Sequence, residues 1–248
     1  MSMQTAQKLA FVTGASGGIG HAIALRLLAE GYAVACGYYA HKASVTELAK
    51  AHPTALAVRV DIHSRASICR ALKMARAHYG IPVTIVVNNA GIADERPFAA
   101  ITDAEWDRVL ETNLRGAFIV TQEVLHEMQK MGWGRIINIV SIGGQWGGMR
   151  QVHYAAAKAG LISFTHSMAK LYSASGITSN AVAPGLVATD MIKKEVRSKH
   201  GKAKIASIPI GRLTTPEEVA GTVAFLASDD AASITGQTIN INGGLLFS

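Results

Sequence analysis

Short apolar runs rich in Val and Ile alternate along the chain with longer segments in which apolar residues recur every three or four positions. Apolar runs of about four to eight residues are typical of strands, and the longer pattern is typical of helices that bury one face. The expected strands are 8–13, 32–38, 54–60, 82–88, 135–141, 177–183 and 237–241. The expected helices are 20–31, 42–52, 64–80, 102–130, one that starts near 151, and 215–228. This alternation predicts an α/β fold with a doubly wound, seven-stranded parallel sheet that helices cover on both faces.

Two helix starts are marked by residues that cap backbone N–H groups. Thr102 with Glu105, and Thr215 with Glu218, have the spacing of a capping box. Pro216 strengthens the second signal, because proline fits the first helical position, where its missing N–H is not needed. Helices are therefore expected to begin at about 103 and 216.

The helical segment 113–128 carries apolar residues on more than one face. Its predicted core stripe is Leu114, Ala117, Phe118, Val124, Leu125 and Met128. Ile119 and Val120 fall on other faces and are expected to be exposed. A helix that is apolar on more than one face often packs against the core with one face and against another subunit with a second face. The pattern therefore predicts a homo-oligomer.

The composition fits one domain that spans residues 1–248. Hydrophobic residues make up 49% of the chain and charged residues 17%, which is enough apolar material for a core. No apolar run approaches the roughly 20 residues that cross a bilayer, and the N-terminal stretch lacks the cleavage site of a signal peptide. Cys36 and Cys69 lack CxxC spacing and the histidines lack paired ligand spacing, so no metal site is expected. We expect a soluble, cytoplasmic protein without membrane contact.

The net charge of +7 comes mostly from dispersed basic residues, which argues against a nucleic-acid-binding face. The exception is the basic segment 193–204, KKEVRSKHGKAK. It is either a solvated surface helix or part of a substrate lid at about 186–210. In the second case it would draw an anionic substrate to the mouth of a pocket.

A glycine-rich turn joins the first strand to the first helix within LAFVTGASGGIGHAIALRLL, residues 9–28. Glycines permit a tight turn and a close approach of backbone to a pyrophosphate, and the free N–H groups of the helix start attract the anion. Four glycines in seven residues exceed what a plain strand-to-helix turn needs, so the pattern predicts a Rossmann-type dinucleotide site. Its expected contacts are Gly14, Ser16, Gly17, Gly18, Ile19 and Gly20.

The segment after the second strand indicates which dinucleotide is preferred. Enzymes for the unphosphorylated cofactor commonly place an acid there to hold the ribose hydroxyls, and this chain has none before Glu47. His41, Lys42 and Ser44 offer donors and charge, which favours NADPH (NADP+) over NADH. The expected contacts on the adenosine side are Tyr38, Tyr39, Lys42, Asp61 and Ile62. Each of two residues has a competing role. Lys42 could merely solvate the start of a helix, and Asp61 could cap a helix.

Several motifs follow one another along the whole chain. They are TGASGGIG at 13–20, NNAG at 88–91, Asn113, Ser141, Tyr154-x-x-x-Lys158 and PG at 184–185. In the order and spacing of these motifs the chain resembles the short-chain dehydrogenase/reductase family, over essentially all 248 residues. It is most similar to the family's 3-oxoacyl thioester reductases. The resemblance implies an NADP-dependent oxidoreductase and a homotetramer.

Tyr154 and Lys158 lie four residues apart in an alanine-rich segment, so on a helix both side chains face one site. A free tyrosine has a pKa of about 10 and is a poor acid near neutrality unless a cation stabilises its anion, which Lys158 can supply. Tyr154 would then protonate a carbonyl oxygen as hydride leaves the nicotinamide, and Ser141 would hydrogen-bond the same oxygen. The resemblance implies that Lys158 also holds the nicotinamide ribose and that Asn113 holds a water that resupplies the proton.

The remaining cofactor contacts are expected in loops at strand ends, where such sheets bind ligands. They are Asn88, Ala90 and Gly91 beside a ribose, and Pro184, Gly185, Val187 and Thr189 beside the nicotinamide. Asn88 could instead brace the end of its strand. The alternative for residues 184–189 is a simple turn after the strand.

These features favour NADPH-dependent reduction of a 3-oxoacyl thioester to the 3-hydroxyacyl thioester. Carrier-dependent relatives usually have basic residues where this chain has Gly132 and Ser175, which argues against docking of an acyl carrier protein. Either Lys130, Lys170 and the basic segment 193–204 compensate, or the substrate is a coenzyme A thioester or a small carbonyl compound. The alternatives are a sugar-alcohol, hydroxysteroid or small-carbonyl dehydrogenase, and a nucleotide-binding regulator without catalysis. A regulator would usually lack part of the Asn-Ser-Tyr-Lys set, which is complete here.

Overall fold

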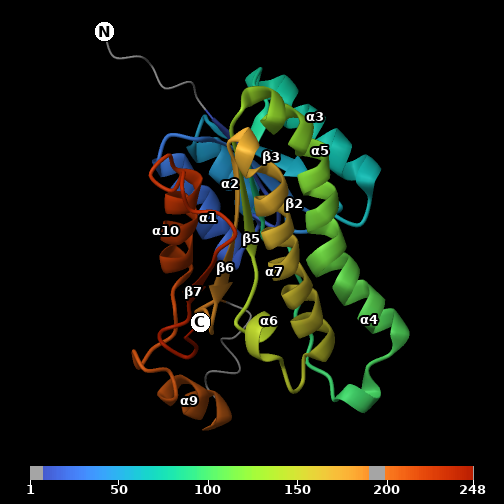
Figure 1. Cartoon of the computed structure of the whole chain (residues 1–248), viewed down its shortest axis with the longest axis vertical. Helices are drawn as coiled ribbons and strands as arrows, with labels where there is room; N and C mark the ends of the chain where they lie inside the picture. Colours follow the sequence, from blue (N-terminus) through green and yellow to red (C-terminus); the bar gives the residue numbers. More distant parts are fainter. Residues whose placement is uncertain (1–7, 190–198, 248) are drawn as a thin grey trace.

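The computed structural model describes residues 8–189 and 199–247 and shows a sheet between two layers of helices (Figure 1). The strands are β1 (Leu9–Val12), β2 (Ala33–Tyr38), β3 (Ala55–Arg59), β4 (Val83–Asn88), β5 (Gly134–Ile139), β6 (Ile177–Pro184) and β7 (Thr238–Ile241). The helices are α1 (Gly18–Ala29), α2 (Ala43–Ala51), α3 (Arg65–Tyr79), α4 (Asp103–Leu110), α5 (Gly116–Met131), α6 (Gly143–Trp146), α7 (Val152–Tyr172), α9 (Lys199–Ala206) and α10 (Pro216–Ala227). Two 3-10 turns are Phe98–Ala100 and Ser173–Ser175. A π-helical turn, called the π-turn below, is Glu111–Arg115.

The strands pair in parallel in the order β3-β2-β1-β4-β5-β6-β7. The predicted seven-stranded, doubly wound sheet is therefore confirmed. After β3, at one edge, the chain returns to β4 beside β1, so the strand order reverses between β1 and β4. Sheets of this kind bind ligands in the crevice at the carboxyl ends of the strands at that point.

Each face of the sheet packs against helices through its own apolar core. Helices α1, α2 and α10 cover one face, where Ile23 and Val219 are buried (Figure 1). Helices α3, α5 and α7 cover the other face, where Leu72 and Val124 are buried. A strand covered on both sides has to be apolar on both sides, which explains the continuous apolar runs in the sequence. No helix in the described part of the chain has both the length and the apolar character that spanning a bilayer requires.

Both predicted capping boxes are confirmed. The hydroxyl of Thr102 accepts from the Glu105 N–H at 3.2 Å, and the Glu105 carboxylate accepts from the Thr102 N–H at 3.1 Å. The corresponding distances for Thr215 and Glu218 are 3.2 Å and 2.8 Å. Both helices thus begin where the sequence places them.

The predicted helix 102–130 contains the π-turn between α4 and α5, and its predicted core stripe is wrong in part. Ile119 and Val120, expected to be exposed, are 1% and 0% exposed, whereas Phe118 is 41% exposed. Helix α5 packs on both the sheet and α3, and Ile119 and Val120 belong to that shared core. Phe118 lies outside this buried face and is turned toward solvent.

Candidate active site

The glycine-rich turn connects the carboxyl end of β1 to α1. Gly14 and Gly18 have φ angles of +67° and +53°, in the left-handed region that L side chains rarely adopt. A Cβ on Gly20 would lie 2.2 Å from the carbonyl oxygen of Gly14, so the turn packs this closely on the helix only with glycine at position 20. Gly17 is the N-cap of α1 and offers no side chain to the first N–H groups of the helix. These groups fit a pyrophosphate, as predicted for residues 14–20.

Asn89, which the sequence pattern does not single out, ties this turn to β4. Its Nδ2 donates to the carbonyl oxygens of Thr13 at 2.9 Å and Gly14 at 3.1 Å. The hydroxyl of Thr13 in turn accepts from the N–H groups of Asn89 and Ala90, both at 3.0 Å. The phosphate turn and the loop after β4 therefore form one unit. The sequence signal for this role is the pair of adjacent asparagines, 88 and 89, at the end of a strand. Successive side chains of a strand point to opposite faces, so one of the two points away from the core.

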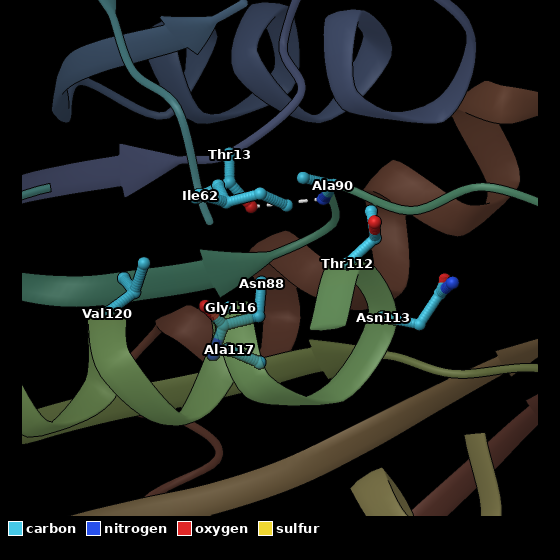
Figure 2. Close-up of a pocket in the computed structure, with 9 residues that line it drawn as sticks. All are labelled: Thr13, Ile62, Asn88, Ala90, Thr112, Asn113, Gly116, Ala117 and Val120. Atoms are coloured by element: carbon cyan, nitrogen blue, oxygen red, sulfur yellow. Dashed lines mark hydrogen bonds between the residues drawn. The ribbon is translucent and has the colours of Figure 1, made fainter. Parts of the chain in front are cut away.

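Asn88 is that pair's inward-facing member. Its Nδ2 donates to Thr121 Oγ1 at 3.1 Å and to Asn138 Oδ1 at 2.8 Å, so its side chain braces β4 against α5 and β5. This is the alternative role that the sequence left open, and a cofactor contact by Asn88 stays a prediction. A small pocket lies beside it (Figure 2). Its lining is Thr13, Ile62, Asn88, Ala90, Thr112, Asn113, Gly116, Ala117 and Val120.

The donors predicted after β2 have different surroundings. The Ser44 hydroxyl donates to the carbonyl oxygen of Ser16 at 2.6 Å, so it is engaged with the phosphate turn. Lys42 is the N-cap residue of α2, and its side chain is exposed. Tyr38 is buried at the end of β2, and Tyr39 is exposed beside it. Lys42 is thus an exposed cation near this strand end, as both of its predicted roles require.

Arg59 adds a second cation that the sequence analysis did not assign. The parallel register pairs Tyr38 with Arg59 at the ends of β2 and β3. The Arg59 guanidinium carbon lies 5.9 Å from the centroid of the Tyr39 ring, within the range of a cation–π contact. The guanidinium is exposed and stands where an adenosine ribose is expected at the strand ends.

Asp61 and Ile62 follow β3 in a short loop. The Asp61 carboxylate accepts from the His63 N–H at 3.0 Å. Ser64 caps helix α3, because its hydroxyl accepts from the Ser67 N–H at 3.3 Å. Asp61 therefore does not cap this helix, which was its alternative role. Contact of Asp61 and Ile62 with an adenine stays a prediction.

Lys158 is buried on the second turn of α7, at 3% exposure. Its ammonium donates to the carbonyl oxygen of Ile139 at 2.7 Å and lies 5.5 Å from the ring centroid of Tyr154. Burial lowers the pKa of Lys158 to about 8, because desolvation disfavours the charged form. The four-residue spacing thus brings the two side chains together, as the sequence predicts.

Tyr154 and Ser141 meet at the carboxyl end of β5. Burial raises the pKa of the Tyr154 hydroxyl, and a hydrogen bond with Ser141 lowers it by a smaller amount. The pKa of Tyr154 is thus raised overall, whereas a lowering by Lys158 was expected from the sequence. The reason is that desolvation outweighs the effect of the neighbouring groups. The Ser141 hydroxyl accepts from the Gly143 N–H at 3.1 Å, which leaves its hydrogen free to donate.

Helix α6 packs very closely on α7 at Gly144. A Cβ there would lie 2.8 Å from the carbonyl carbon of Lys158 and 2.9 Å from both Lys158 Cβ and the nitrogen of Ala159. Glycine at this position therefore sets the distance between Ser141, just before α6, and the two α7 side chains.

Asn113 lies in the π-turn, 1% exposed. Its Nδ2 donates to the carbonyl oxygens of Ile92 at 2.9 Å and Val109 at 3.0 Å. Within the described residues its Oδ1 has no hydrogen-bond partner. A Cβ on Gly91 would lie 2.5 Å from that oxygen and 3.5 Å from Lys158 Nζ. A buried acceptor without a partner in the described part of the chain, on the side of Gly91 that also faces the Lys158 ammonium, fits a bound water, although the water itself stays a prediction.

The loop after β6 turns back over the start of α1. Gly185 donates its N–H to the carbonyl oxygen of Ile241 at 3.0 Å, and Val187 pairs with Thr214. The Thr189 methyl group would lie 3.3 Å from a Cβ on Gly18, so this loop reaches the phosphate turn. Residues 190–198 lie outside the described residues, and so does the first half, 193–198, of the basic segment 193–204.

Comparison with known proteins identifies relatives along the whole chain. Residues 14–246 match the model of a family described as enoyl-(acyl carrier protein) reductase. An acetoacetyl-CoA reductase of Rhizobium meliloti is 44% identical over 243 residues, which covers 97% of this chain and 99% of the relative. A 3-oxoacyl-[acyl-carrier-protein] reductase of Pseudomonas aeruginosa is 44% identical over 252 residues and covers 100% of both chains.

A solved structure supports the same assignment. A protein of Agrobacterium tumefaciens, provisionally described as a gluconate dehydrogenase, matches with a TM-score of 0.92 at 33% identity, over 97% of this chain and 96% of that chain. The full-length matches in sequence and fold agree with the order of motifs from the phosphate turn to Lys158. The chain therefore belongs to the short-chain dehydrogenase/reductase family of oxidoreductases.

Proposed function

We propose that this chain reduces the ketone of a 3-oxoacyl thioester and that NADPH is the hydride donor. The observation that carries the proposal is the placement of Ser141, Tyr154 and Lys158 together at the carboxyl edge of the sheet, beside the phosphate turn. The names of the two relatives at 44% identity support a 3-oxoacyl thioester as the substrate class.

The chain's own residues supply the proton chemistry. When bound, NADPH would supply the hydride that reduces the carbonyl carbon. Tyr154 is the proton donor, since burial raises the pKa of its hydroxyl and keeps it protonated until a carbonyl oxygen accepts the proton. Ser141 donates a hydrogen bond to the same oxygen. Lys158 stabilises the tyrosinate that remains, and Asn113 Oδ1 holds the water that returns a proton to Tyr154.

The preference for NADPH rests on the ends of β2 and β3. An acid that would repel a 2′-phosphate is absent between Tyr38 and Glu47. Lys42 and Arg59 place two cations near the expected adenosine ribose. A guanidinium binds phosphate through charge-assisted hydrogen bonds, so Arg59 is the stronger of the two candidates.

Coenzyme A is the thioester carrier that the geometry favours. Gly132 and Ser175 precede β5 and β6, so they lie at the edge of the sheet opposite to Ser141 and Tyr154. Neither position carries a charge that would attract an acidic carrier protein. A carrier docked there would be remote from the site of the same chain, whereas a coenzyme A thioester can diffuse to it.

We also propose that the chain forms a homotetramer. A hollow on the outer surface of α4, the π-turn and α5 has an apolar centre with charges of both signs around it. Its lining is Asp107, Leu110, Glu111, Leu114, Arg115 and Phe118. A surface with both partners of an ion pair can contact its own copy across a two-fold axis, which supports self-association.

A substrate panel tests the proposed function. NADPH oxidation is measured with acetoacetyl-CoA, the same acyl group on acyl carrier protein, crotonyl-CoA as an enoyl thioester, and a simple ketone. Reduction of NADP+ is measured with gluconate, which would be oxidised. The proposal predicts the highest kcat/KM for acetoacetyl-CoA. Preference for crotonyl-CoA or gluconate would contradict it.

A pair of variants on α7 tests the mechanism. Tyr154→Phe is expected to lower kcat by orders of magnitude while NADPH binding is kept, because only the proton donor is lost. Tyr172→Phe, at the far end of the same helix, is the matched control and should retain activity. Near-normal turnover by Tyr154→Phe would refute the assigned role.

A further inference from the structure

We infer that His63 is a positioning residue, which transmits occupancy of the adenosine half of the cofactor site to the π-turn that holds Asn113. The inference rests on the proposed NADPH-dependent function. His63 follows Asp61 and Ile62, the expected adenine contacts, whereas Asn113 belongs to the proton pathway on the nicotinamide side. The contacts between the two segments come from side chains about 50 positions apart in the sequence.

The first contact joins His63 to the residue before Asn113. His63 Nε2 lies 2.8 Å from Thr112 Oγ1. The Thr112 hydroxyl donates its only hydrogen to the carbonyl oxygen of Arg108 at 2.7 Å, so it can only accept from the imidazole. His63 therefore carries a hydrogen on Nε2, and its Nδ1 lies 3.9 Å from an Asp61 carboxylate oxygen.

Two further contacts fix the same loop to the same turn. The Arg115 guanidinium donates to the carbonyl oxygen of His63 at 3.3 Å. Gly116 packs directly on Ile62, since a Cβ on this glycine would lie 3.2 Å and 3.3 Å from side-chain carbons of Ile62. Figure 2 shows Ile62, Thr112 and Gly116 around one small pocket.

These contacts leave the loop and the π-turn little freedom to move separately. Thr112 and Asn113 are adjacent, so a shift of the imidazole that displaces Thr112 also displaces Asn113. The Asn113 side chain has its own bonds to Ile92 and Val109, and its Oδ1 is held near Lys158 only while the π-turn keeps its shape. An adenosine moiety on Asp61 and Ile62 would hold the loop in place and so stabilise the π-turn through His63.

Ligand-induced protection from hydrogen exchange tests the coupling without turnover. The probe is adenosine 2′,5′-bisphosphate, which carries the adenosine half of NADPH and no nicotinamide. Exchange of peptides that cover residues 109–116 is compared with and without a saturating concentration, set for each variant from its Kd by calorimetry. The probe should slow exchange in the wild type and in His63→Gln, whose amide N–H can replace the Nε2 donor. It should have little effect on this segment in His63→Ala.

Steady-state kinetics provide the second test. At saturating NADPH, His63→Ala and Thr112→Val should each lower kcat by roughly two- to tenfold, the range expected for one net hydrogen bond. Thr112→Ser keeps the hydroxyl and should retain kcat. The double variant should be no worse than either single one, because both remove the same contact. The solvent isotope effect on kcat should rise, since the proton resupply step is the one impaired.

Specific results would overturn the inference. Absence of probe-induced protection at 109–116 in the wild type would do so, and so would equal protection in His63→Ala. Multiplicative losses in the double variant, or a change confined to the KM for NADPH, would show that His63 shapes only the adenosine site. A failure of the proposed function has a different signature, since the wild type would then reduce no 3-oxoacyl thioester at all.

Discussion

Gly144→Ala is expected to damage catalysis by moving two helices apart. A Cβ at this position would lie 2.8 Å and 2.9 Å from atoms of Lys158 and Ala159, including backbone atoms of α7. Backbone atoms inside a long helix cannot rotate out of the way, so α6 has to move as a unit. Ser141 lies directly before α6 and would move with it, away from Tyr154 and Lys158.

The size of the effect follows from these distances. Ordinary contacts begin at 3.4 Å, so α6 must shift by roughly half an ångström. A misplacement of about 1 Å can cost about a hundredfold in rate, so half of that displacement is expected to cost roughly tenfold in kcat. Overpacking of this kind also destabilises by about 1–3 kcal/mol, against a gain of about 1 kcal/mol from replacing glycine in a helix.

Gly143→Ala is the matched control, one residue earlier in the same helix. Its Cβ would lie 3.4 Å from the Ser141 hydroxyl, an ordinary contact, and the Gly143 N–H that serves Ser141 is retained. Both variants are assayed for NADPH oxidation with acetoacetyl-CoA, for NADPH affinity and for stability in urea. Equal kcat values in the two variants would refute the claim that the α6–α7 distance at Gly144 positions the catalytic groups.

Three further predictions concern pH, cofactor preference and assembly. Burial lowers the pKa of Lys158 to about 8, so its ammonium is lost as the pH rises through that value, and kcat/KM for NADPH, which reports the free enzyme, should fall there. A profile that stays flat well above this pH would contradict a need for the charged form. Arg59→Ala should raise the KM for NADPH roughly tenfold, through loss of a charged hydrogen bond, and leave the KM for NADH unchanged, whereas equal changes for both cofactors would rule out a 2′-phosphate contact. The wild type should have a tetrameric mass by light scattering at micromolar concentration, and Phe118→Asp should lower it, while a monomeric wild type would refute self-association.

The sequence predicts well those features that depend on residues near one another in the chain. The capping box at Thr102, the alternation of strands and helices, and the approach of Tyr154 to Lys158 all follow from local geometry. A helix places residues four apart on one face whatever surrounds it, so spacing alone is sufficient there. Spacing does not decide which face of α5 is buried. The helix is apolar on several faces, and its packing against both α3 and the sheet buries Ile119 and Val120 and leaves Phe118 outside.

Features that depend on pairing between distant segments were not predictable from one sequence. Arg59 reaches Tyr39 because of strand register, and His63 reaches Thr112 because a loop and a helix meet across about 50 residues. The direction of the Tyr154 pKa shift also depends on burial, which the motif does not encode. Motifs therefore identify candidate catalytic groups, while the groups that position them become visible only in the fold.

The bond between Asn89 and the phosphate turn has a consequence for biosynthesis. The side chain of Asn89 joins Thr13 and Gly14 across about 75 residues, and β1 lies between β2 and β4 in the sheet. A nascent chain can complete this turn once β4 has left the ribosome, since domains form from the N-terminus as they are made. Lys158 and Tyr154 emerge much later, on α7. The growing polypeptide would thus become able to hold a nucleotide before Asn113, Ser141, Tyr154 and Lys158 have emerged, and cofactor bound at that stage could aid folding without any risk of premature reaction.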